Sequence, residues 1–438
     1  MKIARGISIH PFDDKVYVHS VVNQRDYIFE GIVLDVLNFF ATHENAEVDE
    51  LCAKLLTEYE VDEAELQRDI HEFVEELLAE KILIAADETE EPWSNKIPME
   101  VAAIFAKQHK LFSMGLELTW RCPLKCIHCY IDDAPKFPAA NELTTDEYKK
   151  ILRQAREMGC VQVLFTGGEV LLRRDLCDLV EYATELGLIV NVYTTGVGLT
   201  DESFERLCAT TVNSISFSLY SGVADEHDKI TGVKGSFKQT LKAALKFKAA
   251  GVNTFIKSVV IQQNLSSIES LYRLGERLNL YVSVSSRIVA GHDGKCAENF
   301  FLGNLELYKK FFKLRAHYVP ADPTADEFCR EAMLDGSACN AGRSSISIDP
   351  FGGVHACITF REAFGSVRED DLQTLWERAR HIDFGNRRLR DVTPHCSNCK
   401  YLRYCTVCVA DLKNRAHGKS DDCGETLLMA QAAAAAAN

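Results

Sequence analysis

Three cysteines in the middle of the chain have a spacing that suits iron–sulfur chemistry. Cys122, Cys126 and Cys129 lie four and three residues apart and follow an apolar segment, residues 111–120, that we expect to form a strand. A loop at the end of a strand can place such a trio around one corner of a cubane cluster, in which each iron normally takes one thiolate. Because the motif supplies three thiolates, it predicts a cluster with one iron left open for an exchangeable ligand.

A second concentration of cysteines lies near the C-terminus. Eight of the 16 cysteines fall within the 95 residues 329–423, namely Cys329, Cys339, Cys357, Cys396, Cys399, Cys405, Cys408 and Cys423. The N-terminus, Met1 to Gly6, is followed by alternating residues and not by the apolar core of an export signal. We therefore expect a cytoplasmic protein whose thiols are reduced and bind metal. Zinc is the alternative to iron–sulfur clusters for both groups of cysteines.

Strands and helices alternate through the middle of the chain. The predicted strands lie near residues 111–120, 161–166, 188–194, 213–219, 253–262 and 279–288. The predicted helices lie near residues 144–158, 171–186, 200–209, 236–250, 266–278 and 304–316. This order predicts an α/β fold with a parallel sheet and right-handed crossovers. Active sites of such folds lie at the carboxyl ends of the strands, where the cysteine trio is also expected.

Small and polar residues mark the ends of three further predicted strands. Gly167, Gly168 and Glu169 end the second strand, Thr195 follows the third, and Ser218 lies at the end of the fourth. Two adjacent glycines let the backbone approach a ligand without interference from side chains. A strand-end hydrogen bond or a helix cap is the ordinary structural alternative for each polar residue.

The first 90 residues carry the whole charge imbalance of the chain. They hold 7 Lys and Arg against 22 Asp and Glu, whereas the other 348 residues hold 42 of each sign. Period-two segments at residues 7–10, 15–21 and 26–29 precede helical patterns at residues 32–41, 48–58 and 62–80. Asp62, with Glu65 three residues later, predicts the N-terminal cap of the third helix. We expect a separate, small winged-helix-like domain.

The cysteine trio, with the aromatic His128 before its last member, and the Gly-Gly-Glu turn together resemble the radical S-adenosylmethionine (SAM) superfamily. This resemblance implies that the open iron binds the amino and carboxylate groups of SAM. It implies that an electron from the cluster splits SAM into methionine and a 5′-deoxyadenosyl radical. It also implies that the parallel sheet forms a partial (β/α)6 TIM-like barrel.

The same resemblance assigns roles to strand-end residues. It implies that His128 contacts the adenine and that Gly167 and Gly168 expose backbone carbonyls to the SAM amino group. Glu169 would add charge complementarity there, and Ser218 would place a hydroxyl near the ribose or carboxylate.

Some positions depart from the pattern of the superfamily. Thr195 takes the place of a common asparagine, Val170 that of the usual proline, and Tyr220 that of the usual acid. Lys229 or Arg287 would then supply the cation for the SAM carboxylate.

The C-terminal cysteines resemble the SPASM pattern, the auxiliary-cluster extension of this superfamily. The resemblance implies one [4Fe-4S] cluster held by Cys396, Cys399, Cys405 and Cys423. It implies a second held by Cys339, Cys357 and Cys408, with either Cys329 or an open iron completing the set. The chain would thus carry three [4Fe-4S] clusters, one of which binds SAM.

The N-terminal segment resembles the precursor-peptide recognition (PqqD-like) domain found at the start of many peptide-modifying radical SAM enzymes. Such a domain binds an extended leader peptide by adding a strand to a sheet edge. DNA binding is the alternative, but phosphate contacts need Lys and Arg, and this segment has an excess of fifteen acids. We therefore expect a peptide partner and no nucleic acid. No run of about 18 apolar residues occurs, so we expect no membrane partner.

These patterns divide the chain into five parts. They are a recognition domain (residues 1–85), a linker ending in a short helix (86–110), a radical SAM barrel (111–318), a SPASM domain (319–429) and a low-complexity tail (430–438). The alanine-rich tail is interpreted as a remnant of cloning or a frayed helix.

The combined resemblance implies a maturase of ribosomally made peptides, similar to sactipeptide and ranthipeptide enzymes, that forms an intramolecular cysteine thioether. Alternatives are carbon–carbon or carbon–oxygen crosslinking, epimerisation, or sulfatase-maturase-like oxidation of cysteine or serine. A non-catalytic iron–sulfur regulator is the alternative outside enzymes. An external electron donor of flavodoxin or ferredoxin type would reduce the SAM-binding cluster.

Overall fold

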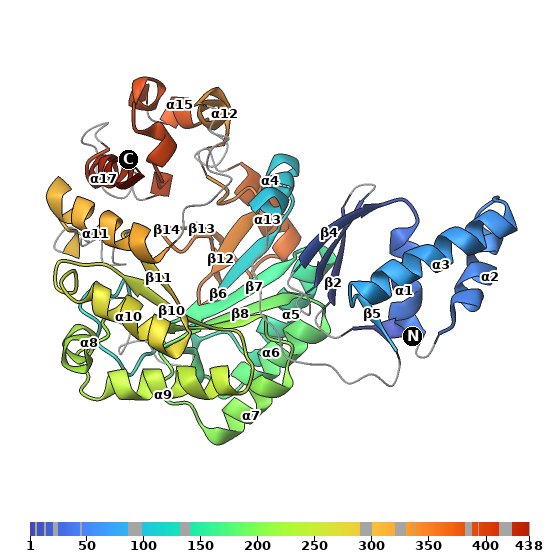
Figure 1. Ribbon diagram of the computed structural model, residues 1–438, viewed down its shortest axis with the longest axis horizontal. Coiled ribbons are helices and arrows are strands. Elements are labelled where there is room, and N and C mark those ends of the chain that lie inside the picture. The colour runs from blue at the N-terminus through green and yellow to red at the C-terminus, as the bar shows by residue number, and fades with distance from the viewer. Residues whose placement is uncertain are drawn as a thin grey trace.

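The computed structural model describes most of the chain. The described residues are 1–4, 7–12, 15–20, 25–43, 46–85, 99–131, 141–289, 300–319, 330–337, 339–381, 388–392, 394–410 and 423–437. Figure 1 shows an N-terminal unit of strands and helices beside a larger α/β body, with the C-terminal elements above it. None of the helices described is both long and apolar enough to cross a membrane.

The N-terminal unit follows the sequence pattern closely. Its sheet has the order β2 (Ile7–Phe12), β3 (Lys15–Ser20) and β4 (Arg25–Glu30), with antiparallel pairing throughout. Helices α1 (Val33–Thr42), α2 (Val48–Glu58) and α3 (Glu63–Ala79) pack on it, and the short strands β1 (Lys2–Ile3) and β5 (Leu83–Ile84) pair beside them. The predicted cap is confirmed, since the Asp62 side chain accepts from the Glu65 amide at 2.9 Å. The winged-helix-like classification stays a prediction.

The larger body is built on parallel strands. These are β6 (Ser113–Thr119), β7 (Gln162–Gly167), β8 (Ile189–Thr194), β9 (Ser214–Ser218), β10 (Thr254–Val259) and β11 (Tyr281–Ser285), each paired in parallel with the next. Helices α5 (Thr145–Glu157), α6 (Leu176–Glu185), α7 (Asp201–Ala209), α8 (Ala224–Thr231), α9 (Ser236–Ala249), α10 (Ile268–Leu278) and α11 (Leu305–Tyr318) connect or follow them. The predicted α/β class with a parallel core is therefore confirmed.

Alternate residues of each strand serve different purposes. On β6, Met114, Leu116 and Leu118 are buried in the main apolar core with residues of the helices. Ser113 and Gly115, on the other face, line an open cavity. Since successive side chains of a strand point to opposite faces, this alternation gives a sheet with an apolar outer face and a more polar inner one.

C-terminal strands extend the same sheet beyond β6. β12 (Ser345–Ile348) pairs in parallel with β6, and β13 (Gly353–Cys357) and β14 (Phe360–Ser366) follow in antiparallel order. The remaining elements there are α12 (Arg330–Asp335), α13 (Leu372–Arg380), α15 (Leu389–Val392), η6 (Pro394–Asn398), η7 (Leu402–Tyr404) and α17 (Glu425–Ala437). The sequence did not predict that this region continues the parallel sheet.

Two predictions about helices are wrong. The helix expected over residues 171–186 is a short 3-10 turn, η3 (Val170–Leu172), followed by α6, because the Glu169 side chain accepts from the Leu171 amide and closes the turn. Residues 430–437, interpreted from the sequence as a remnant of cloning or a frayed helix, are the packed end of α17, which contacts α11. Alanine has the highest helix propensity, and here Ala432 is completely buried.

The N-terminal unit packs against the amino ends of the barrel strands. Tyr17 of β3 and Phe105 of α4 (Met99–Gln108) form a buried cluster with Phe112, Val161 and Ile189, which lie at the starts of β6, β7 and β8. This contact places the sheet of the N-terminal unit beside the amino ends of the parallel strands, whereas the cysteine loop leaves the carboxyl end of β6.

A buried histidine and a partly buried arginine add a polar contact to this interface. Arg156 of α5 donates to the Ile9 carbonyl at 2.9 Å and to Nδ1 of His10 at 3.1 Å. Because a guanidinium can only donate, Nδ1 must accept and His10 must be neutral. Burial, together with the charge of Arg156, holds the pKa of His10 well below its usual value of 6.5.

We predict that this contact makes stability depend on pH. The unfolded chain binds a proton at His10 near pH 6.5 and the folded chain does not, so stability is fully present above that pH and falls below it, by about 1.4 kcal/mol per pH unit for this one group. Denaturant unfolding of wild type and His10→Gln between pH 7.5 and 5.5 measures the difference. His71→Gln, at an exposed histidine of α3, controls for loss of an imidazole. Equal pH slopes in wild type and His10→Gln would contradict the assignment.

Candidate active site

The cysteine loop, defined here as residues 120–131, leaves the carboxyl end of β6. Cys122, Cys126 and Cys129 are free thiols, each partly buried in this loop. The backbone of the loop is tied to the end of α8, because the Lys125 amide donates to the Thr231 carbonyl at 2.8 Å. The structure thus brings the three predicted ligands together on a fixed support at the strand ends.

The thiols of the loop influence one another. Burial is the main reason that the pKa of Cys122 is raised to about 12, and nearby Glu169 and Cys129 add to the rise. Burial and the other two thiols likewise raise the pKa of Cys126. Among the described residues, no three His, Cys, Asp or Glu side chains are arranged to hold a single metal ion, as a mononuclear centre would require. A cubane takes one thiolate per iron, so this donor set fits a cluster.

Aromatic side chains pack against the cysteine loop from β9 and α8. The His128 ring meets Tyr220 edge-on with centroids 4.5 Å apart, and Tyr220 stacks on His227 at 5.7 Å. Tyr220 is hydrogen-bonded to the Cys126 thiol, which lowers the pKa of that thiol against the larger effect of burial. Tyr220, which replaces the usual acid, therefore supports the loop. Nδ1 of His128 is buried without a partner among the described residues, so this ring can still accept a polar contact.

The two glycines of the Gly-Gly-Glu turn lie directly against the cysteine loop. A Cβ at Gly167 would overlap the Thr119 carbonyl, and one at Gly168 would overlap the Arg121 carbonyl. The Gly168 amide donates to the Thr119 carbonyl at 2.7 Å, and the Glu169 amide to the Arg121 carbonyl at 2.9 Å. Glycine is thus required because two backbones meet here, in addition to any ligand.

Glu169 points its carboxylate toward the end of β8. One oxygen accepts from the Leu171 amide at 3.0 Å and the Thr194 hydroxyl at 2.5 Å, and the other accepts from the amide and hydroxyl of Thr195. Burial raises the pKa of Glu169, and these donors oppose the rise. Both oxygens of Glu169 are therefore occupied, and its carboxylate fixes the position of Thr195. Ser218 lies at the end of β9, next to Lys257 in the register of β10.

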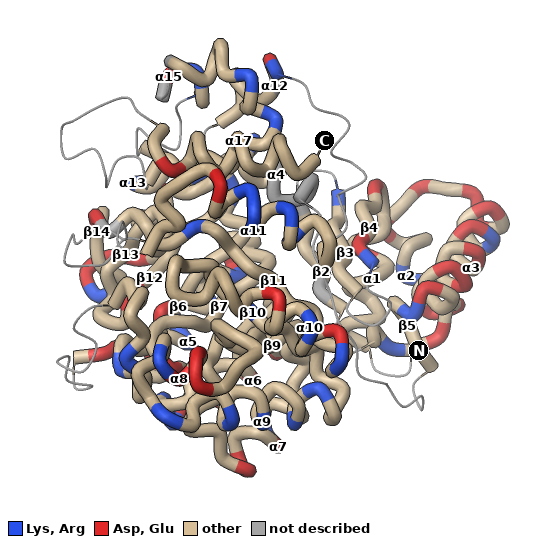
Figure 2. The backbone as a smooth tube through the Cα atoms, turned by 60° about the vertical axis from the view of Figure 1, so that its left-hand side comes forward, with Lys and Arg blue, Asp and Glu red and all other residues tan. Residues whose placement is uncertain are grey.

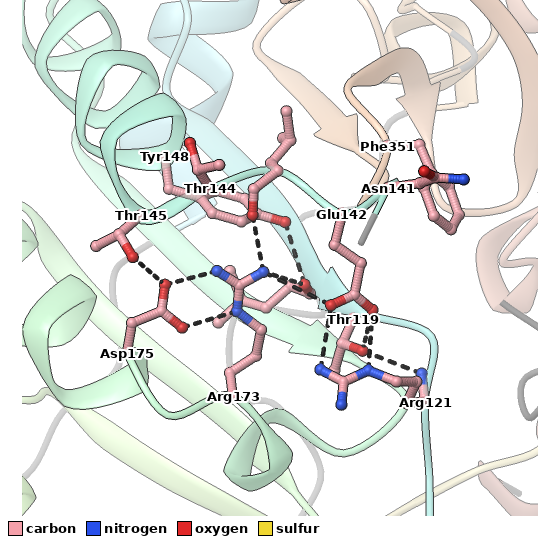
Figure 3. Close-up of polar contacts among 12 residues, drawn as sticks. Thr119, Arg121, Asn141, Glu142, Thr144, Thr145, Tyr148, Arg173, Asp175 and Phe351 are labelled. Carbon is pink, nitrogen blue, oxygen red and sulfur yellow. Dashed lines mark hydrogen bonds and ion pairs between the residues drawn. The ribbon is translucent and has the colours of Figure 1, made fainter. Parts of the chain in front are cut away.

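A buried ion network joins the cysteine loop to the Gly-Gly-Glu turn (Figure 3). Glu142 accepts from the Thr119 hydroxyl at 2.5 Å and from Arg121 at 3.1 Å, and it lies 3.7 Å from Arg173. Arg173 in turn pairs with Asp175 at 2.6 Å. The positive charges of two arginines and the negative charges of two carboxylates therefore balance one another where the cysteine loop leaves β6.

An open cavity of about 560 Å³ lies on the inner face of the sheet. Its wall includes residues from β6 through β13, among them Tyr193, Ser216, Lys257, Ser347 and Cys357. Because Cys357 belongs to the C-terminal cysteines, the cavity connects the barrel interior with that second group.

The C-terminal cysteines fall into two spatial sets. Cys339, Cys357 and Cys408 pack together around one small apolar cluster, and Cys339 and Cys408 each raise the pKa of Cys357 beyond the effect of burial. The second set comprises Cys396, Cys399, Cys405 and Cys423. Burial is the main reason that the pKa of Cys405 is raised to about 11, and the other three thiols of the set add to the rise. Cys329 lies outside the described residues.

Arg287, one of the two candidate partners of the SAM carboxylate, lies beside the C-terminal cysteines. It donates to Thr406 at 3.3 Å and acts electrostatically on Cys339, so it belongs to the C-terminal cysteine region. The sequence analysis also missed Glu142, Arg173 and Lys257. The first two gave no local signal, whereas the lysine in an otherwise apolar and small-residue strand was a signal that could have been used.

Family models match three parts of the chain. The radical SAM superfamily matches residues 116–275, the iron–sulfur cluster-binding SPASM domain matches residues 339–400, and the coenzyme PQQ synthesis protein D (PqqD) model matches residues 34–83.

Curated relatives carry two different names. An AdoMet-dependent heme synthase of Nitratidesulfovibrio vulgaris is 27% identical over 332 residues, which cover 70% of this chain and 88% of that protein. A PqqA peptide cyclase of Rhizobium meliloti is 28% identical over 322 residues, covering 69% of this chain and 83% of the cyclase.

Solved structures share the fold. Streptococcus suis SuiB bound to S-adenosylmethionine superposes with a TM-score of 0.58 at 16% identity, covering 96% of this chain and 98% of SuiB. AnSMEcpe with bound AdoMet gives 0.55 at 15% identity, covering 73% and 94%. Together with the family matches, the site marks an enzyme with a radical SAM domain whose cofactors are SAM and [4Fe-4S] clusters.

We predict that Glu142→Gln destabilises the fold and the cluster site together. The substitution removes the one carboxylate between two guanidinium groups, and breaking a buried pair typically costs about 3–5 kcal/mol. Denaturant unfolding and iron content after reconstitution measure the two effects. Asp370→Asn, which breaks the exposed pair with Arg378, should cost about 1 kcal/mol or less. Equal behaviour of the two variants would refute this role of Glu142.

Proposed function

We propose that this chain is a radical SAM/SPASM maturase that forms an intramolecular cysteine thioether in a ribosomally made precursor peptide. When bound, SAM and its cluster supply a 5′-deoxyadenosyl radical, which takes hydrogen from a carbon of the peptide. The residues of the chain hold these cofactors, position the peptide and exclude water from the cavity.

The observation that carries this proposal is the position of Cys357. Its side chain belongs to a set of three neighbouring thiols, and it also lines the cavity on the inner face of the barrel strands. An auxiliary cluster held there would border the space in which the peptide lies. Coordination to metal deprotonates a thiol, so a peptide cysteine at an open iron would need no side chain as general base.

We assign the first cluster to Cys122, Cys126 and Cys129. His128 would contact the adenine, Gly167 and Gly168 would offer backbone carbonyls to the SAM amino group, and Ser218 would place its hydroxyl near the ribose or carboxylate. Glu169 and Thr195 would contribute as a hydrogen-bonded pair, since the carboxylate accepts from both the amide and the hydroxyl of Thr195.

Two auxiliary [4Fe-4S] clusters complete the proposed set of three. One would be held by Cys396, Cys399, Cys405 and Cys423, and the other by Cys339, Cys357 and Cys408, with Cys329 or an open iron as the fourth position. The mutual effects of the thiols on their pKa values support this grouping. An external donor of flavodoxin or ferredoxin type would supply the electron.

The domain boundaries proposed from sequence fit this division of work. A recognition domain (1–85) would pack, through a linker (86–110), on a partial (β/α)6 barrel (111–318), and the SPASM domain (319–429) would cover the carboxyl side. The boundary at 429 divides α17, so we extend the last domain to the end of that helix.

The peptide partner is assigned to the edge of β4. In the described part of the chain β4 pairs with β3 on one side and with no strand on the other. Helix α3 lies beside it, since Phe29 meets Phe73 edge-on at 5.7 Å and Tyr27 donates to Glu80 at 2.6 Å. An unpaired edge beside a helix offers main-chain hydrogen bonds and side-chain contacts to an extended peptide.

Charge opposes nucleic acid as the partner of this domain. Figure 2 shows Asp and Glu along α2 and α3, and the first 90 residues hold three times as many acids as Lys and Arg. Such a surface repels phosphate, whereas nucleic-acid binding depends on cationic side chains.

A carbon–carbon crosslink in a peptide is the second candidate. The match to a PqqA peptide cyclase over 69% of the chain favours it, because that protein acts on a peptide by its printed name. The same cavity and cofactors serve both reactions, so only the product separates them.

Mass spectrometry tests the proposal. The reduced, reconstituted protein is incubated with SAM and the short cysteine-containing peptide encoded beside its gene. We expect the loss of two hydrogens per crosslink and a peptide cysteine that no longer reacts with an alkylating agent. Loss of two hydrogens with a reactive cysteine would point to the carbon–carbon crosslink. An unchanged peptide mass despite SAM cleavage would overturn the peptide proposal.

A further inference from the structure

A lysine side chain lines the cavity on the inner face of the sheet. Lys257 lies in the middle of β10 and lines this cavity of about 560 Å³. Its ammonium donates to the Tyr193 hydroxyl of β8 and lies 4.0 Å from the centroid of that ring. Because β9 lies between β8 and β10, the lysine side chain spans the inner face of β9.

This cation has no counter-ion in the described part of the chain. The interactions of Lys257 are those with Tyr193, and no described carboxylate lies within ion-pair distance of its ammonium. Glu117, the acid of β6, accepts instead from Trp120 at 3.2 Å and Tyr130 at 2.7 Å in the cysteine loop. Lys257 is partly exposed in this cavity, and a cation that has no carboxylate partner attracts a ligand of opposite charge.

Two hydroxyls of the same cavity lack partners. Ser216 of β9 is 2% exposed and Ser347 of β12 is 3% exposed, and neither hydroxyl has a hydrogen-bond partner among the described residues. Ser216 is the register neighbour of Tyr193, the residue that Lys257 contacts, and it lies two residues before Ser218, the register neighbour of Lys257. Gly115, the register neighbour of Ser347, leaves open space in front of that hydroxyl.

These groups call for one kind of ligand. An ammonium has three donors and no acceptor, and each hydroxyl can donate once. Water would satisfy the hydroxyls but would leave the charge of Lys257 uncompensated. A carboxylate supplies both the negative charge and enough acceptor sites, and charge-assisted hydrogen bonds are the stronger kind.

We propose that Lys257, with Ser216, binds a carboxylate of the substrate in this cavity. The inference rests on the proposed function in taking that substrate to be a peptide, so the carboxylate belongs to an Asp or Glu side chain or to the peptide C-terminus. Because Cys357 lines the same cavity, this anchor holds the neighbouring peptide residue close to the auxiliary thiols.

A matched pair of small probes tests the site without any peptide. N-acetyl-glutamate α-amide carries one side-chain carboxylate, and N-acetyl-glutaminamide is its neutral counterpart. Binding to the reconstituted enzyme is followed by saturation-transfer NMR. We expect wild type to prefer the acid at least tenfold, Lys257→Arg to keep the preference, and Lys257→Met to lose it with unchanged iron content. Equal binding of the two probes by wild type, or an unchanged preference in Lys257→Met, would overturn the proposal.

A space-filling variant separates charge from shape. Gly115→Ala adds a methyl group that meets the Ser347 hydroxyl at 3.6 Å, an ordinary contact. It should weaken the acid and the amide alike and so preserve their ratio. If Gly115→Ala changes the ratio of acid to amide binding as much as Lys257→Met does, the shape of the cavity, and not the charge of Lys257, decides the preference.

The peptide then identifies the source of the carboxylate. Versions with single Asp→Asn or Glu→Gln changes, and one with an amidated C-terminus, are compared by KM. We expect one of them to raise KM at least tenfold in wild type and to have no further effect in Lys257→Met. Probe binding without any peptide modification would retain this site and reject the proposed function. If the peptide is modified but its KM is the same in wild type and Lys257→Met, the proposed function is retained and this carboxylate site is rejected.

Discussion

Glu142 is the carboxylate on which the geometry of the candidate active site depends. It is almost fully buried, and it touches the last residue of β6, the first arginine of the cysteine loop and the arginine that follows the Gly-Gly-Glu turn. A buried ion network of this kind contributes little net stability compared with apolar packing, but it strongly disfavours arrangements that leave a charge unpaired. The network therefore fixes how the loop leaves its strand.

The positions of the neighbouring residues depend on how the cysteine loop leaves β6. With the loop held at Thr119 and Arg121, the glycines of the next strand can approach its backbone directly, and Glu169 then orders the end of β8. The outer faces of the strands are apolar and pack on helices, so polar residues remain for the inner face. The C-terminal region adds β12 to the same sheet, which brings Cys357 to the wall of the cavity. One continuous sheet thus places the loop, the cavity and the auxiliary thiols in a single frame.

Local patterns predicted most elements of this frame. The periodicity of β9 indicated residues 213–219 against the observed Ser214–Ser218, and α2 was predicted at its observed bounds, because both depend on neighbouring residues. The contact of Glu142 with Arg173 depends on how two loops meet, and no periodicity reports it. The pairing of β12 with β6 joins segments more than 200 residues apart, and the inward direction of Lys257 becomes visible only once the sheet is formed. The helix that starts at Leu176 was misplaced because a side chain, Glu169, closes the turn before it.

The most direct test of this account is electron–nuclear double resonance of the reduced protein with SAM labelled with ¹⁵N at its amino group. The account places an open iron in the loop of Cys122, Cys126 and Cys129, so the label should couple to the cluster in wild type. The coupling should vanish in Cys126→Ala, which retains the C-terminal cysteines. No coupling in wild type, or the same coupling in Cys126→Ala, would contradict the assignment of SAM to this loop.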